Sequence, residues 1–146
     1  MKLSLSSFIP YRLSVAANVA SGLIARAYRD RFELSIPEWR LIAILAESER
    51  LTPQDLTRET RMDKIAVSRA AARLESAGLV ARAGNPGDRR SHFLALTAQG
   101  RSLYREVAPA ALELEAQLLE DFSTDERRQL EALLRRIEAA ALARMS

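Results

Sequence analysis

The chain has 146 residues, of which 48% are hydrophobic and five each are glycine and proline, and this composition predicts one compact unit rather than a fibrous or disordered chain. It has no cysteine and a single histidine, which excludes disulfides, cysteine nucleophiles, thiol redox sensing and a histidine-rich metal site. No apolar run approaches the roughly 20 residues that span a bilayer, and the N-terminus lacks the apolar stretch of a signal peptide, so we expect a cytoplasmic protein without a membrane partner.

The net charge of +3 is distributed unevenly along the chain. Residues 1–34 carry five basic and two acidic side chains (net +3), residues 35–105 carry twelve and eight (net +4), and residues 106–146 carry five and nine (net −4). A polyanion is attracted to the basic part of a protein surface. We therefore expect nucleic acid to meet the middle of the chain and the acidic C-terminal part to lie away from it.

Two helices are expected in the N-terminal third. Residues 8–32 place apolar side chains at helical spacing, among them Ile9, Leu13, Val19, Leu23 and Ala27. The second helix begins after Ser35, where Ser35-Ile36-Pro37-Glu38 has the pattern of a capping box with proline in the first turn. Its apolar face is formed by Leu41, Ile42, Leu45 and Ala46.

A helix-turn-helix is expected next. Thr52 is a suitable N-cap for a helix over 53–60, with Pro53 at its first position. A tight connection at Arg61-Met62 leads to Asp63, which is placed to cap a second helix over 64–77. This arrangement of two helices is typical of proteins that insert the second helix into the major groove of DNA.

The second helix of this pair has two distinct faces at 100° per residue. The side suited to a core holds Val67, Ala70, Ala71, Leu74 and Ala77, whereas the outer side holds Ile65, Ser68, Arg69, Ala72 and Ser76, flanked by Lys64 and Arg73. Small residues permit close approach to a groove, and Arg, Lys and Ser donate to base edges and phosphates. First-turn residues reach deepest, so the predicted readers are Lys64, Ile65, Ser68 and Arg69, with Arg73 as a further DNA contact.

A hairpin is expected after this helix. Gly78 is a suitable helix C-cap, 79–82 and 92–96 have the composition of strands, and 84–88 has that of a turn. Arg89 and Arg90 follow the turn, and arginines at such a tip can enter a narrow minor groove. Asp88 would repel phosphate, so we expect it to be structural, either accepting from turn amides or pairing with an arginine.

Two further helices complete the chain. Thr97 is placed to cap a long helix over 98–121, and Ser123-Thr124-Asp125-Glu126 has the pattern of a capping box for a last helix over 124–143. Leucine, isoleucine and alanine are frequent in 8–32 and in these last helices, and in so small a chain some of those faces lack an intrachain partner. One such module also gains little DNA specificity, whereas two copies on a two-fold axis bind a pseudo-palindrome. We therefore expect a homodimer rather than a closed monomeric bundle.

The segment Asp88-Arg89-Arg90-Ser91-His92-Phe93-Leu94-Ala95-Leu96-Thr97 resembles the wing signature of the MarR family of transcriptional regulators. The preceding stretches 63–69 and 74–82, and Thr97-Ala98-Gln99-Gly100 after it, resemble the same family in register over about 35–105. The resemblance implies a mainly α winged helix-turn-helix, with 1–146 as a single domain, 35–97 as the DNA-binding lobe, and 1–34 and 98–146 as dimerisation helices. It also implies that Arg90 is the minor-groove arginine and Asp88 its structural partner.

By the same resemblance the expected function is sequence-specific binding of double-stranded DNA, as a repressor that a small aromatic or lipophilic effector releases. The side chains in segments that would approach an effector cleft are Tyr11, Arg12, Tyr28, Trp39 and Arg40. The simpler interpretation assigns Trp39 to the hydrophobic core and Arg12 and Arg40 to ion pairs. The run Ala70-Ala71-Ala72 leaves few polar readers in the middle of the helix, so DNA shape would supply much of the specificity.

Two other classes of function fit the sequence less well. Nothing predicts an enzyme, because His92 lies in a predicted strand, no phosphate-binding or dinucleotide-binding glycine pattern occurs, and the carboxylates are scattered over helices. We expect no catalytic residue, metal or cofactor. The alternative is a winged helix that binds another protein and not DNA, but such modules usually lose the basic tip that Arg89 and Arg90 supply here.

Overall fold

The computed structural model describes residues 1–146 and is mainly helical, with one antiparallel hairpin, as the sequence predicts. Its elements are η1 (Leu5–Ser7), α1 (Ile9–Phe32), α2 (Ile36–Ala46), α3 (Pro53–Thr60), α4 (Lys64–Ser76), β1 (Val80–Gly84), β2 (His92–Leu96), α5 (Ala98–Leu118) and α6 (Thr124–Met145). None of these helices has the length and apolar character needed to cross a membrane.

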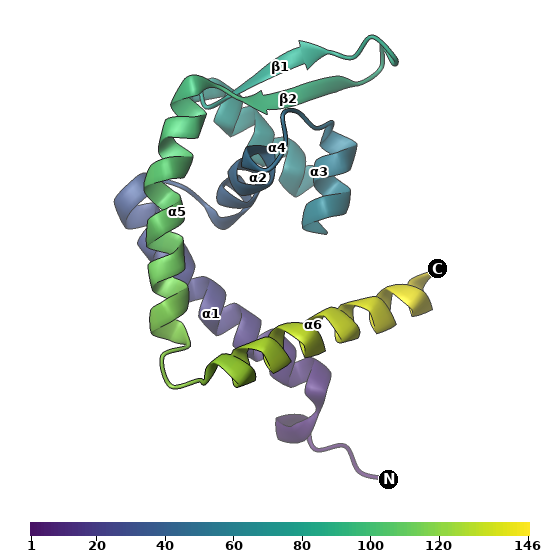
Figure 1. The fold of residues 1–146 in the computed structure, drawn as a ribbon. Coiled ribbons are helices and arrows are strands. Elements are labelled where there is room, and N and C mark those ends of the chain that lie inside the picture. Colours follow the sequence, from purple (N-terminus) through teal and green to yellow (C-terminus); the bar gives the residue numbers. More distant parts are fainter. The chain divides into compact units, whose positions relative to one another are not determined.

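The chain divides into two compact units, and the division falls inside α5 at Pro109. The first unit, residues 1–109, contains α1 to α4, the hairpin and the first half of α5. Within it, α2, α3 and α4 gather on one side of the hairpin (Figure 1). The second unit, residues 110–146, contains the rest of α5 and the whole of α6, which has no buried residue.

The core of the first unit forms where α2, α3, α4 and the hairpin meet. Every large side chain in this core is almost completely shielded from solvent; the residues are Leu41, Ile42, Leu45, Leu56, Val67, Leu74 and Leu94. Their spacing follows the apolar faces expected for α2 and α4. Burial of side chains of this size contributes about 1.5–3 kcal/mol each, so this cluster holds the three helices against the hairpin.

Side-chain caps fix the starts of the helices where the sequence predicts them. Ser35 and Glu38 form a reciprocal capping box, as do Thr52 and Asp55, and the Asp63 carboxylate accepts from the Ala66 amide at 2.8 Å. Ser123 and Glu126 form the same box at α6. The hydrogen bond from the Thr52 amide is the main cause of a lowered pKa for Asp55, because it stabilises the ionised carboxylate.

Some boundaries differ from the sequence-based prediction. Ala77 was assigned to the buried face of the second helix, but α4 ends at Ser76, and Ala77 is an exposed C-cap residue beyond the last packed turn. The long helix ends at Leu118 rather than 121, because the Glu120 amide donates to the Gln117 carbonyl and tightens the chain into a turn before Ser123. The last helix extends to Met145, since nothing in 143–145 interrupts it.

The first strand of the hairpin is longer than the sequence predicts. Val80 pairs with Leu96 and Gly84 with His92, so β1 extends two residues beyond the predicted strand end at Arg82. Leu51 adds a bridge to the other edge of β2, with its amide and carbonyl hydrogen-bonded to Leu94 at 3.0 and 2.8 Å. This bridge anchors the middle of β2 to the connection between α2 and α3.

A junction of four residues joins α4, the hairpin and α5. Gly78 adopts φ +76° and turns the chain from α4 into β1. The Thr97 amide donates to the Leu79 carbonyl (3.1 Å), and the Thr97 hydroxyl donates to the Gly78 carbonyl (2.7 Å) and accepts from the Gly100 amide (3.0 Å). The predicted Thr97 cap is confirmed, and it bonds the end of α4 as well as the start of α5.

Gly100→Ala tests how tightly this junction is packed. A Cβ built on Gly100 overlaps the Leu79 carbonyl oxygen, which belongs to the backbone and cannot rotate away. We expect the free energy of unfolding to fall by about 3 kcal/mol, at the upper end of overpacking costs, in urea unfolding followed by circular dichroism. Gly84→Ala is the matched control, because nothing lies within 4 Å of its added methyl and its φ is negative, and it should leave stability unchanged or slightly raised. Equal losses in the two variants would contradict a packed junction.

Candidate nucleic-acid interface

The outer face of α4 is exposed, and its inner face is held in the core. Val67, Ala70 and Leu74 are buried, with at most 4% of each exposed. The outer residues Ile65, Ser68, Arg69, Ala72 and Ser76 are all exposed, as the helical wheel predicts. The helix therefore presents a surface of small and basic side chains while its orientation is fixed by packing.

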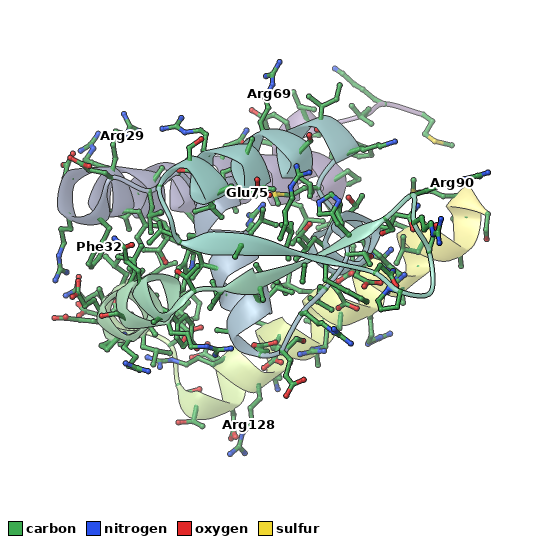
Figure 2. The ribbon with its side chains drawn as sticks, turned by 90° about the horizontal axis from the view of Figure 1, so that it is seen from above. Arg29, Phe32, Arg69, Glu75, Arg90 and Arg128 are labelled. Carbon is green, nitrogen blue, oxygen red and sulfur yellow. The ribbon has the colours of Figure 1, made fainter.

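The cations of this helix fall into two groups. Lys64 and Arg69 make no ion pair, and Arg69 projects away from the helix in Figure 2. Arg73 behaves differently, since its Nε lies 3.6 Å from Oε2 of Glu38 on α2. The structure thus leaves the two cations in the first half of α4 without an ion pair, whereas the third is exposed and lies beside a buried carboxylate of the same chain.

Glu38 is the buried end of that ion pair. Only 4% of the residue is exposed; its Oε1 accepts from the Ser35 amide at 3.3 Å, and its Oε2 has no hydrogen-bond partner. A carboxylate removed from water needs a counter-charge, and Arg73 is the cation that faces it. Sequence reasoning identified Glu38 only as part of a capping box, because the pairing of α2 with α4 is not visible in local sequence.

The hairpin tip is a network of turn hydrogen bonds that leaves two arginines free. The Asp88 carboxylate accepts from the Arg90 amide at 2.9 Å, and the Asn85 side chain accepts from the Gly87 amide at 3.0 Å. The expectation that Asp88 accepts from turn amides is confirmed, and no arginine pairs with it. Arg89 and Arg90 are exposed and make no ion pair, and Figure 2 shows Arg90 at the far end of the hairpin from its junction.

Two further arginines near the hairpin contact other side chains of the same chain. Arg82 on β1 donates through Nε to the Glu75 carboxylate on α4 at 2.6 Å, which ties the strand to the helix. Arg50 lies 4.4 Å above the ring of Phe93 on β2, in cation–π geometry. Neither contact was predicted, because each depends on how a strand of the hairpin packs against another segment and not on a local sequence signal.

The predicted effector residues are only partly brought together. Trp39 packs edge-on against Tyr28, with ring centroids 5.6 Å apart, and stacks on Tyr104 of α5 at 5.8 Å. Tyr28 is buried, and that burial raises its pKa. Tyr104 was missed, although an aromatic residue in the first turns of α5 is a detectable signal.

The remaining predicted effector residues lie apart from this aromatic cluster. Arg40 is exposed, as are Tyr11 and Arg12 in the first turn of α1. At 1.5 Å per residue, Tyr11 is about 25 Å along the helix axis from Tyr28. A single chain therefore does not bring these side chains around one cleft.

Comparison with known proteins gives a consistent result. A sequence model described as the MarR family matches residues 32–91. The chain is 39% identical over 70 residues to the transcriptional regulator FarR of Neisseria gonorrhoeae, an alignment covering 48% of each protein. It is 30% identical over 104 residues to the homoprotocatechuate degradative operon repressor of Escherichia coli, covering 71% of this chain and 70% of that one.

The fold is also similar to that of a solved DNA complex. The MarR family transcriptional regulator Sco3205 from Streptomyces coelicolor, solved in complex with DNA, superposes with a TM-score of 0.85 at 28% identity, covering 97% of this chain and 91% of that one. The similarity therefore extends beyond the hairpin and α4 to nearly the whole chain.

Replacing Arg73 separates its structural role from that of Arg69. Arg73→Ala removes the cation that faces a buried carboxylate, so we expect the free energy of unfolding to fall by about 1 kcal/mol, at the low end for such a loss because Arg73 itself is exposed. Arg69→Ala, on the same helix but without a partner, should change it by less than about 0.5 kcal/mol. Urea unfolding measures both, and an equal effect of the two changes would contradict the proposed pairing.

Proposed function

The chain belongs to the MarR family of transcriptional regulators, and on that basis we propose that it binds double-stranded DNA as a homodimer through α4 and the hairpin tip. The observation that carries the proposal is that some arginines and lysines form ion pairs within the chain and others do not. Those without an ion pair on these two elements are Lys64, Arg69, Arg89 and Arg90, whereas Arg58, Arg73 and Arg82 are bound to carboxylates of the same chain.

Each element has a distinct role in this proposal. The first half of α4 enters the major groove, where Ser68 and Arg69 donate to base edges and Lys64 to phosphate. Arg90 enters the adjacent minor groove and Arg89 contacts the backbone, while Asp88 holds the tip in shape. Arg73, also predicted to contact DNA, is exposed and in addition orients α4 through Glu38. The likeness to Sco3205 in complex with DNA supports this mode of binding.

The proposed homodimer rests on apolar surfaces that one chain leaves exposed. In α6, Leu130, Leu133, Leu134 and Ile137 follow the spacing of one helical stripe and are each at least 40% exposed. In the N-terminal part, Leu3, Leu5, Ile9, Val19 and Leu23 are 48–70% exposed. We assign 1–34 and 98–146 to dimerisation and 35–97 to the DNA-binding lobe. A two-fold pair of such lobes binds a pseudo-palindromic operator with half-sites about one turn apart.

We propose repression as the outcome, acting in the cytoplasm where the operator DNA lies. The similarity to a repressor of a homoprotocatechuate degradative operon supports this assignment. A small aromatic or lipophilic effector that binds beside the Tyr28–Trp39–Tyr104 cluster would release the DNA. Such an effector acts by preferring another spacing of the two α4 helices, with a coupling of about 1–3 kcal/mol. The exposed Tyr11 and Arg12 could join that site only from a second chain.

Arg90→Ala tests the proposal on a duplex selected by the wild-type protein from a library of random sequences. We expect about tenfold weaker binding than wild type and a slope of log affinity against log salt that is shallower by about 0.9, because the minor-groove arginine is a cation that displaces condensed counterions from the DNA. Fluorescence anisotropy with a labelled duplex, between about 50 and 200 mM salt, measures both quantities.

Arg29→Ala is the matched control, since Arg29 is an exposed arginine without an ion pair that lies in α1 outside the DNA-binding lobe. It should bind as wild type does. Equal loss in the two variants would contradict a specific role for the hairpin tip. Failure of the wild-type protein to enrich any duplex would instead favour a winged helix that binds protein.

A further inference from the structure

One apolar side chain interrupts the polar outer face of α4. Ile65 is 64% exposed, although every other large apolar residue of this helix is buried. It lies in the first turn, directly after Lys64, and Ser68 and Arg69 occupy the next turn on the same side. The exposed isoleucine is therefore surrounded by groups that suit nucleic acid rather than by an apolar patch.

Folding does not account for an isoleucine at this position. A β-branched residue is a weaker helix former than alanine, and an exposed side chain contributes little to the core. The cap of α4 is supplied by Asp63, which bonds the Ala66 amide without any contribution from Ile65. A protein or lipid partner would require further apolar residues beside it, but the neighbouring outer positions are Lys64, Ser68, Arg69 and Ala72.

The major groove offers one apolar group on its base edges, the 5-methyl of thymine. Ile65 and Arg69 are four residues apart and so lie on the same side of α4, about 6 Å apart along its axis. Successive base pairs are 3.4 Å apart along one strand. A helix lying in the groove would therefore place these two side chains about two base pairs apart.

We propose that Ile65 determines sequence specificity by packing on the 5-methyl group of a thymine about two base pairs from the base that Arg69 contacts. This inference rests on the proposed function, since it requires the first turn of α4 to enter the major groove. Its chemistry is desolvation of two apolar groups without a hydrogen bond, so it distinguishes thymine from uracil, which differs only by that methyl.

Substitution of single thymines by deoxyuridine in the duplex selected by the wild-type protein tests the inference. Deoxyuridine keeps the Watson–Crick pairing and removes the methyl alone. We expect one position in each half-site at which wild type binds about fourfold more weakly, the equivalent of about one buried methyl(ene) group. Ile65→Ala should bind the thymine and deoxyuridine duplexes equally at that position. Ser76→Ala, at the other end of the same outer face, should keep the wild-type discrimination.

The outcomes separate this inference from the function on which it rests. One outcome is that wild type binds the selected duplex specifically while deoxyuridine at every position weakens its binding no more than that of Ile65→Ala. In that case the thymine contact is wrong and the DNA-binding function stands. If wild type selects no duplex at all, both are wrong. Circular dichroism of Ile65→Ala should match wild type, because alanine is the better helix former at an exposed site.

Discussion

The junction of Gly78, Leu79, Thr97 and Gly100 determines the geometry on which the candidate interface depends. The Thr97 hydroxyl donates to the Gly78 carbonyl in the turn after α4 and accepts from the Gly100 amide in the first turn of α5, and Gly100 allows the two backbones to touch. The hairpin leaves from this point, so its base is fixed to the helix that carries Arg69. The Arg82–Glu75 pair and the Leu51–Leu94 bridge hold the same strands from either side. As a consequence, the outer face of α4 and the hairpin tip are presented to a partner together.

Ion pairing within the chain then determines which basic residues are available to bind DNA. In the DNA-binding lobe, residues 35–97, arginines close to carboxylates form ion pairs within the chain. The most buried of these carboxylates is that of Glu38, and Arg73 of α4 faces it. On α4 and at the hairpin tip, the cations without an ion pair are Lys64, Arg69, Arg89 and Arg90. A modest net charge of +3 is thus compatible with DNA binding, because the position of unpaired charge matters more than its total.

Much of this architecture could be predicted from the sequence, because its signals are local. Capping residues such as Ser35, Thr52 and Asp63 fix helix starts through side chains that reach only three residues ahead, and the composition of 92–96 predicts the strand that is found there. The inner and outer faces of α4 follow from helical periodicity. Errors occurred at helix ends, as at Ala77, where α4 stops one residue before its apolar pattern does.

Long-range contacts could not be predicted in the same way. The pairing of Arg73 with Glu38, the stacking of Tyr104 on Trp39 and the position of Arg50 over Phe93 each join elements whose packing is set by the whole core. The exposure of Ile65 was predicted by the helical wheel, but its isolation among polar neighbours became evident only once the other apolar residues of α4 were seen to be buried.

The most direct test of DNA binding by a dimer is dimethyl sulfate protection of a duplex selected by the wild-type protein, because this reagent methylates guanine N7 in the major groove and adenine N3 in the minor groove. Binding by a dimer through α4 and the hairpin predicts two blocks of protected guanine N7 centred about one helical turn, roughly 10 base pairs, apart. Each block should be flanked by protected adenine N3 where the hairpin tips lie. A single block, or protection confined to one groove, would contradict binding by a dimer through α4 and the hairpin together.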